Sequence, residues 1–196
     1  IESEFQNQAS EAVETGLEEY DKRHGFRRPE NIAEFFDVEF FGTTREDKLR
    51  QIDNILSRDS NTSSDNNSGL QKVFNYLNQF TENKGRFLGV VTNVGKNLEV
   101  LSRSGEILDV MWTEDLNWAR PYINENRRGA RPRSFKNFLD LGDLVWLKKD
   151  KITGFVALTQ IPEAQSALIS IDPKIGSILA LVGGYDFFLS KFNRVE

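Results

Sequence analysis

The hydrophobic positions of the first twenty residues recur at steps of three and four along the chain. This spacing places them on one face of an amphipathic helix, so we expect a helix over residues 3–20. The positions on this face are Phe5, Ala9, Ala12, Val13, Gly16, Leu17 and Tyr20. Ser3 followed by Gln6 has the spacing of a capping box, which would close the start of the helix.

Three more helices are expected before residue 84. Apolar side chains recur at helical spacing over residues 31–41, 44–56 and 70–80. Residues 57–69, in contrast, are polar and low in complexity. Such a segment buries too little apolar surface to offset the entropy lost on ordering, so it predicts a flexible linker.

From Gly85 onward the pattern changes to short alternating runs, which are typical of β-strands. Three strands come first, then a connection with a short helix and a basic stretch, and then two more strands. The strands are expected over 86–94, 97–102, 105–112, 143–149 and 154–160, and the short helix over 113–119. This order of elements is that of an OB-fold, a small five-stranded β-barrel.

The sequence after residue 160 predicts one β-hairpin. Alternating apolar residues at 166–172 and 177–182 flank a turn-forming Pro-Lys-Ile-Gly sequence at 173–176. One hairpin cannot close a core alone, so it must pack on the other segments or open a further domain. The chain is therefore expected to be an α+β fold, with an OB-like five-stranded barrel, a helical region and a C-terminal hairpin.

Composition narrows the possible functions. The 196 residues carry a net charge of −5, no cysteine and a single histidine, His24. These counts exclude thiolate zinc sites, disulfides, cysteine nucleophiles and any Ser-His-Asp triad not built on His24, and we expect no cofactor. The longest apolar run, 178–182, is far shorter than the ~18–20 residues that span a bilayer, so no membrane contact is expected. The sequence does not begin with Met, which favours an internal piece of a longer protein.

Charge divides the chain into three segments. Residues 1–83 carry 9 basic and 17 acidic residues (net −8), residues 84–160 carry 13 and 9 (net +4), and residues 161–196 carry 3 and 4 (net −1). These bounds coincide with the changes of pattern. We therefore expect a helical linker region over 1–83, a barrel domain over 84–160 and the hairpin over 161–196.

Three stretches carry recognisable motifs. Residues 20–27 read Y-D-K-R-H-G-F-R, and residues 118–122 read W-A-R-P-Y. The third stretch comprises S-A-L-I-S-I-D-P-K from residue 166, L-V-G-G-Y-D-F from residue 181 and S-K-F-N-R from residue 190. In this order they resemble the bifunctional class A penicillin-binding proteins, specifically the 1a type of Gram-negative bacteria. The third stretch resembles the opening of that family's transpeptidase domain, so the resemblance implies that the hairpin over 161–196 is the start of this domain, which ends here before the nucleophile.

The resemblance implies a docking role. In that family a membrane-anchored glycosyltransferase polymerises lipid-linked disaccharides, and a serine transpeptidase cross-links the stem peptides. The inserted OB-like domain of 1a-type members docks an outer-membrane lipoprotein activator. By this resemblance the chain is a non-catalytic docking and linker region in the periplasm. Its expected partners are that activator and the parent's own two catalytic domains.

The resemblance does not extend to a catalytic motif. The family's nucleophile lies in an S-x-x-K motif beyond the F-N-R stretch, and no serine of this sequence has a lysine three residues later. Without that lysine a serine lacks the family's means of activation, so we expect no catalytic residue here. Residues 174–176 read K-I-G and look like the family's K-T-G triad, but they follow Asp-Pro in a hairpin and predict a turn.

The basic stretch between the third and fourth strands is the candidate docking site. It combines arginines with aromatic residues, which commonly anchor protein interfaces. The candidate residues are Trp118, Arg120, Tyr122, Arg127, Arg128, Arg131 and Arg133. An equally weighted interpretation is a solvated crossover loop that its Arg-Pro steps keep extended.

A module that binds single-stranded nucleic acid is the remaining alternative, since OB-folds bind such strands through basic grooves and stacking aromatics. However, Glu99, Glu106 and Asp109 lie on the strands expected to form the binding face, where they would repel phosphate. We therefore expect no nucleic acid among the partners.

Other polar and aromatic residues have structural interpretations. His24 is expected to hydrogen-bond in a tight turn. Glu18 and Glu19 are expected to be solvated rather than to act together, because adjacent helix positions diverge by ~100°. Trp146 is expected in the core, and Trp118 is expected to brace the basic loop against the barrel.

Overall fold

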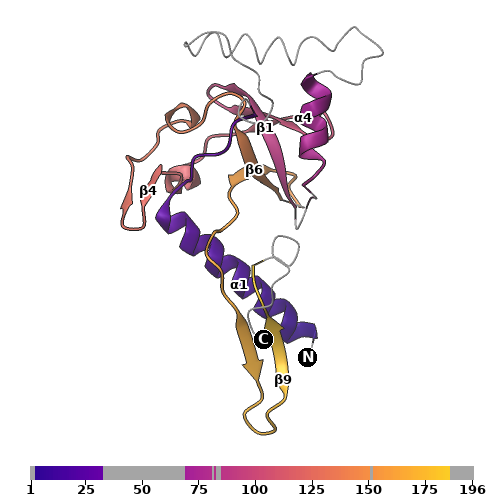
Figure 1. Cartoon of the computed structure of the whole chain (residues 1–196). Coiled ribbons are helices and arrows are strands. Elements are labelled where there is room, and N and C mark those ends of the chain that lie inside the picture. Colours follow the sequence, from indigo (N-terminus) through magenta and orange to yellow (C-terminus); the bar gives the residue numbers. More distant parts are fainter. Residues whose placement is uncertain (1–2, 33–68, 81, 83–84, 151, 186–196) are drawn as a thin grey trace. The chain divides into compact units, whose positions relative to one another are not determined.

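The computed structural model describes residues 3–32, 69–80, 82, 85–150 and 152–185 (Figure 1). The chain forms two compact units, which are treated separately below. The helix–hairpin unit comprises residues 1–25, 124–127 and 161–196, and the barrel unit comprises residues 26–123 and 128–160. Apart from residues 31, 32 and 69, the helices expected over 31–41 and 44–56 and the linker expected over 57–69 lie outside the described residues. None of the described helices is both long and apolar enough to cross a bilayer.

In the helix–hairpin unit, one helix packs on one hairpin. Helix α1 (Ser3–His24) carries the amphipathic face that the sequence predicts, and it lies against strand β9 (Ile178–Val182). Strand β9 pairs antiparallel with β8 (Leu168–Ile171). The buried residues of this core are Ala9, Val13, Leu17, Ala180, Val182 and Tyr185. The hairpin thus buries its apolar face on α1.

The N-terminal end of α1 differs from the expectation. Gln6 does not close a capping box with Ser3. Its side-chain Nε2 donates to the Leu181 carbonyl and its Oε1 accepts from the Leu181 N–H, both at 3.0 Å. The capping-box prediction is therefore wrong, because the unpaired backbone edge of β9 takes the Gln6 amide as its partner. At its other end the helix continues to His24 and stops at Gly25, whose φ of 101° favours glycine.

The hairpin turn follows the chemistry that its sequence predicts. Asp172 accepts a hydrogen bond from Lys174 N at Oδ1 (2.7 Å), and its carbonyl accepts from Gly176 N (2.8 Å). Gly176 has a φ of 71°, a conformation in which glycine is favoured. The K-I-G sequence is thus part of a turn, as expected.

The barrel unit is built on a curled antiparallel sheet, which confirms the predicted OB-like fold. Its strands are β1 (Arg86–Val94), β2 (Leu98–Ser102), β3 (Ile107–Val110), β6 (Leu144–Lys149) and β7 (Val156–Thr159). They pair in the order β3-β2-β1-β6-β7, and the sheet curls so that its two end strands, β3 and β7, lie side by side. This order and curvature are those of a five-stranded, partly open barrel.

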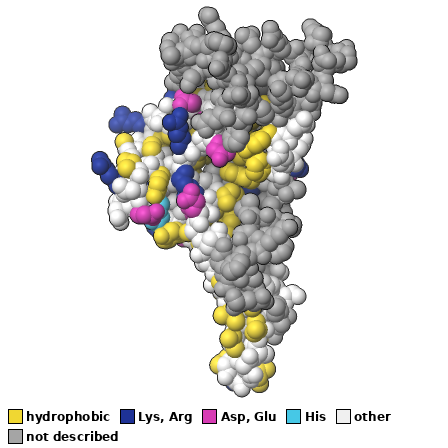
Figure 2. Space-filling model, in the orientation of Figure 1, with side chains coloured by type: hydrophobic (Ala, Val, Ile, Leu, Met, Phe, Trp, Pro, Cys, Tyr) yellow, Lys and Arg dark blue, Asp and Glu magenta, His cyan; other side chains and the backbone are white. Residues whose placement is uncertain are grey.

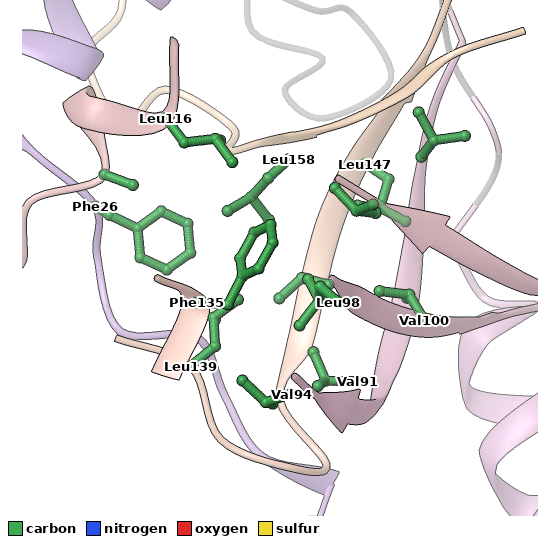
Figure 3. Packing of buried hydrophobic residues seen from close by; sticks show 14 residues of the cluster. Phe26, Val91, Val94, Leu98, Val100, Leu116, Phe135, Leu139, Leu147 and Leu158 are labelled. Carbon is green, nitrogen blue, oxygen red and sulfur yellow. The ribbon is translucent and has the colours of Figure 1, made fainter. Parts of the chain in front are cut away.

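The concave face of the sheet encloses the main core (Figure 3). Phe135, which is fully buried, points into the cluster between Phe26, Leu158 and Leu98. The strands contribute Val91, Val94, Leu98, Val100, Val110, Val145, Leu147, Val156 and Leu158 to this cluster. In β2, β6 and β7 these residues stand at alternate positions, so one side of each strand faces the main core.

Helix α4 (Gly69–Leu77) covers the opposite face of β1 and β6. Val73 and Leu77 from the helix pack with Leu88, Val90 and Leu144 from the sheet. Trp146, expected in the core, is half-buried and packs against this second cluster, edge-on to Phe80 with ring centroids 6.1 Å apart. The barrel therefore has apolar contacts on both faces of its central strands.

The connection from β3 to β6 contains more structure than the sequence predicts. After the expected short helix, a 3₁₀ turn η2 (Glu114–Trp118), come the paired strands β4 (Tyr122–Asn124) and β5 (Arg127–Arg128) and a second turn η3 (Phe135–Asn137). Strands of two and three residues give no readable alternation, so the sequence shows only a basic loop here.

The chain enters and leaves the barrel unit at neighbouring points. The unit begins at Phe26, and the N–H of the next residue, Arg27, donates to Gln160 Oε1 at 3.2 Å. Gln160 is the last residue of the unit. The two ends of the barrel unit are thus joined by a hydrogen bond within the unit itself.

Candidate docking surface

Phe26 fixes the base of the β4–β5 hairpin. Its N–H donates to the Arg120 carbonyl (2.7 Å), and its carbonyl accepts from the Tyr122 N–H (2.8 Å). These two hydrogen bonds form a parallel β-bridge between Phe26 and Pro121. The Phe26 ring is buried in the main core, 5.8 Å from Trp118 and 5.0 Å from Phe138 between centroids. The residue thus ties the hairpin backbone to the barrel core.

A glycine completes the base of the hairpin on its other side. Gly129 N–H donates to the Pro121 carbonyl at 2.7 Å, and its own carbonyl accepts from Arg120 Nε at 2.8 Å. A Cβ on Gly129 would lie 3.1–3.3 Å from three atoms of the Pro121 ring, which is tighter than an ordinary contact. Glycine is therefore the residue that this close approach accommodates.

The end of the basic stretch is anchored by buried residues. Pro132 is buried, and Phe135 three residues later fills the core. The N–H groups of Arg133 and Ser134, which lie between Pro132 and Phe135, donate hydrogen bonds to Asn137 Oδ1 (2.8 and 3.1 Å). The backbone that carries Arg131 and Arg133 is therefore held in one conformation while their side chains are exposed.

The structure places the candidate residues in two groups. Trp118 is half-buried against the main core, where it braces the connection as expected, and Arg120 is half-buried on the Gly129 carbonyl. The exposed candidates are Tyr122, Arg127, Arg128, Arg131 and Arg133. Arg127 belongs to the helix–hairpin unit and the others to the barrel unit.

One exposed residue of this region went unnoticed in the sequence. Ile123 is 49% exposed beside Tyr122, which is 36% exposed. We call the exposed set in the barrel unit the basic surface: Tyr122, Ile123, Arg128, Arg131 and Arg133. Figure 2 shows several Lys and Arg side chains, with Asp and Glu side chains among them, on the side where Figure 1 labels β4. Arginine beside exposed aromatic and aliphatic side chains is the composition of a protein-binding surface.

A buried carboxylate lies in the turn before β6. Asp143 is 5% exposed and accepts hydrogen bonds from Asn31 Nδ2 (2.8 Å, at Oδ1) and Asp140 N–H (2.7 Å, at Oδ2). Burial raises the pKa of this carboxyl to about 6, although its hydrogen bonds act in the opposite direction. It holds the segment around Asn31 on the barrel.

The histidine has the structural role expected of it. His24 Nδ1 donates to the Tyr20 carbonyl (2.9 Å), and its ring lies 4.4 Å from the Tyr20 ring. Glu18 does not stand free, because its carboxylate accepts from the Tyr185 hydroxyl at 3.0 Å. Over the described ranges, no group of three or more His, Asp or Glu side chains is placed to hold a metal ion.

A surface hollow of about 560 Å³ lies in the helix–hairpin unit. It is bounded by one face of α1 and by residues 164–168, and Gly16 leaves its floor open. Tyr20 and Arg23 also line the hollow, and the Arg23 guanidinium carbon lies 5.7 Å from the centre of the Tyr20 ring. Small apolar groups dominate this lining, so it offers shape rather than reactive chemistry.

Comparison with known proteins agrees with the fold. The family model described as "Penicillin-binding protein OB-like domain" matches residues 58–164, more than half of the chain. The chain covers 22% of a crystal structure of penicillin-binding protein 1A from Haemophilus influenzae, with 99% of its own length aligned, a TM-score of 0.61 and 24% identity. This likeness shows the same fold.

Curated relatives match along almost the whole chain. Penicillin-binding protein 1A of Pseudomonas aeruginosa is 34% identical over 195 residues, and that of Vibrio cholerae is 30% identical over 197 residues. In both cases 99% of this chain is aligned, but only 20% and 21% of the relative. The chain spans about a fifth of the length of these relatives. It therefore belongs to the family of penicillin-binding proteins with an OB-like domain and corresponds to a segment of the 1A type.

Proposed function

We propose that this chain is the non-catalytic docking and regulatory region of a bifunctional peptidoglycan synthase. That synthase would join glycan strands with a glycosyltransferase and cross-link their peptides with a D-Ala-D-Ala transpeptidase, on the periplasmic side of the inner membrane. The region would receive an outer-membrane lipoprotein activator. The family assignment supports the parent enzyme, and the absence of an S-x-x-K motif from the sequence supports a non-catalytic role.

The observation that carries the docking proposal is the basic surface. Its arginines are exposed, whereas the backbone beneath them is fixed by Phe26, Gly129 and Phe135. A preorganised surface loses less conformational entropy when a partner binds. Because the charge is positive, the surface fits an acidic patch on the activator, and charge of this kind mainly increases the association rate.

Docking can regulate catalysis only if it favours one arrangement of the parent's domains. A partner shifts such an equilibrium by the difference between its affinities for the two states, and equal affinities would shift nothing. The proposed role is therefore that of a surface whose occupation biases the parent's domain geometry.

A calorimetric titration with the periplasmic portion of the host's lipoprotein activator tests the proposal. We expect saturable one-to-one binding by the unmodified chain. The variant R128E/R131E/R133E should bind at least about tenfold more weakly, because each reversal replaces an attraction with a repulsion. A matched control, K96E/K149E/K174E, makes the same change of net charge at exposed lysines elsewhere and should bind like the unmodified chain.

Two outcomes would contradict the proposal. No binding at tens of micromolar by a folded chain would remove the activator as a partner, and equal weakening by both triple variants would remove the basic surface as the site. An oligonucleotide titrated at two salt concentrations separates the alternative function. Binding of phosphates would show a steep dependence on salt, and we expect no binding because carboxylates line β2 and β3.

A further inference from the structure

The turn between β6 and β7 presents an isoleucine to solvent. Ile152 is 94% exposed, the largest exposed fraction of any large apolar side chain in the part of the chain that the structure describes. Phe155, which precedes β7, is 39% exposed. Single exposed apolar residues are common on protein surfaces, so the meaning of this one depends on how the turn holds it and which charges lie beside it.

One aspartate holds this turn in a fixed conformation. Asp150 Oδ1 accepts hydrogen bonds from the N–H groups of Ile152 (3.0 Å) and Thr153 (2.7 Å) and from the Thr153 hydroxyl (2.8 Å). The Asp150 N–H donates to the Phe155 carbonyl at 2.8 Å, and the Asp150 carbonyl accepts from the Gly154 N–H at 2.9 Å. The hydrogen bonds from Thr153 and Ile152 lower the pKa of the Asp150 carboxyl, so the carboxylate that closes the turn stays ionised at neutral pH. Because the turn is ordered in advance, little conformational entropy is lost when Ile152 is buried.

Lysines flank the turn. Lys148 and Lys149 end strand β6, and both are exposed. Residues 148–155 contain three lysines and one aspartate, a net charge of +2. The carboxylate of that aspartate faces the N–H groups of its own turn. We call Lys148, Lys149, Ile152 and Phe155 the hairpin tip, which combines an exposed apolar end with positive charge.

The composition of the hairpin tip favours a lipid surface over a protein partner. Protein interfaces are enriched in arginine and aromatic residues and depleted in lysine. Lysine is the only basic residue within 148–155. Its ammonium group is a point charge on a flexible stem, which suits the phosphates of a fluid surface because it needs no fixed geometry. Clustered lysines and exposed apolar side chains are the features by which peripheral proteins contact anionic lipids.

We propose that the hairpin tip contacts an anionic lipid bilayer, with Ile152 between the headgroups and Lys148 and Lys149 against their phosphates. The expectation of no membrane contact rests on the length of an apolar run that spans a bilayer, whereas a peripheral contact needs only a few side chains at headgroup depth. One isoleucine and a few lysines give a weak attraction that salt screens. The source of the lipid rests on the proposed function, in which the parent works at the inner membrane. The contact would hold the barrel unit close to that membrane.

Cosedimentation of the whole 196-residue chain with vesicles tests this contact without any other protein. At about 50 mM salt the chain should bind vesicles made of equal parts phosphatidylglycerol and phosphatidylcholine. Binding should be at least about fivefold lower on phosphatidylcholine alone or at about 500 mM salt. I152S should reduce the bound fraction at least about threefold without any change of charge, and K148Q/K149Q should reduce it by a similar factor. Because Ile152 is 94% exposed, I152S should leave the fold intact.

Ile175 provides a matched control. It is 76% exposed in the turn between β8 and β9, where a single lysine, Lys174, stands beside it. I175S should bind the vesicles like the unmodified chain, because its turn lacks the cluster of lysines.

Three results would overturn the lipid contact. The first is no binding of the unmodified chain to anionic vesicles, the second is binding by I152S equal to that of the unmodified chain, and the third is equal weakening by I152S and I175S. The proposed docking function is tested separately, because the calorimetric titration with the activator contains no lipid and I152S should bind the activator like the unmodified chain.

Discussion

Asp143 shows how a single buried carboxylate makes one segment of the barrel unit sensitive to pH. Its two hydrogen bonds join Asn31 to the turn at Asp140, and burial raises its pKa from 3.8 to about 6. Protonation therefore favours the folded state. The stability that this group contributes is complete below about pH 4 and is lost as the pH rises through 6, a change of up to about 3 kcal/mol.

The variant D143N isolates this effect. Asn carries no titrating proton, so the difference in free energy of unfolding between the unmodified chain and D143N should change between pH 4 and pH 7, in favour of the unmodified chain at the lower pH. Urea unfolding at four pH values measures the difference. E114Q, at an exposed carboxylate, should give parallel curves, and parallel curves for D143N would show that Asp143 titrates at the same pH in both states.

At the scale of elements, the β4–β5 hairpin depends on a residue outside it. Phe26 supplies two backbone hydrogen bonds to the hairpin base and a ring to the main core. Replacing it with alanine should lower the free energy of unfolding by about 3–5 kcal/mol, because removal of the ring leaves a cavity beside Trp118 and Phe138.

Denaturant unfolding followed by tryptophan fluorescence measures this loss. F26L keeps most of the volume and should cost less than about 1.5 kcal/mol. Hydrogen exchange at the Tyr122 N–H, which donates to Phe26, should accelerate more in F26A than exchange at the β1 amides. Equal acceleration at both places would mean that Phe26 supports the whole barrel and not the hairpin in particular.

At the scale of elements, the sequence predicts the main strands but not the contacts between distant residues. Strands such as β1 and β6 were predictable, because short apolar runs rich in β-branched residues and bounded by turn signals can be read locally. The bond of Gln6 to Leu181 joins residues 175 positions apart, and no local pattern encodes such a partner. In the candidate site, the exposed arginines were predictable from charge. The burial of Phe135 beside them was not, because one aromatic in a polar loop has no periodicity to indicate its direction.

At the scale of the whole molecule, the two units have separate cores, and a cavity in one should act mainly on that one. All three tryptophans (Trp112, Trp118 and Trp146) lie in the barrel unit. Tryptophan fluorescence therefore reports the barrel unit, whereas far-ultraviolet circular dichroism reports both. The two signals together can assign a loss of stability to a unit.

Leu17→Ala and Leu147→Ala make the comparison, since both leucines are buried, one in each core. Each change should cost its own unit about 2–5 kcal/mol. L17A should shift the circular dichroism transition and leave the fluorescence midpoint unchanged, and L147A should lower the fluorescence midpoint. A shared shift of both signals in L17A would show that the two units unfold as one cooperative body.

The hydrogen bond between Arg27 and Gln160 has an evolutionary consequence. Because the barrel unit begins and ends at neighbouring points, a short loop could replace it without separating α1 from the hairpin that completes its core. A gene could therefore gain, lose or exchange this module in a single insertion or deletion. Such an exchange would involve only the stretch between these two residues.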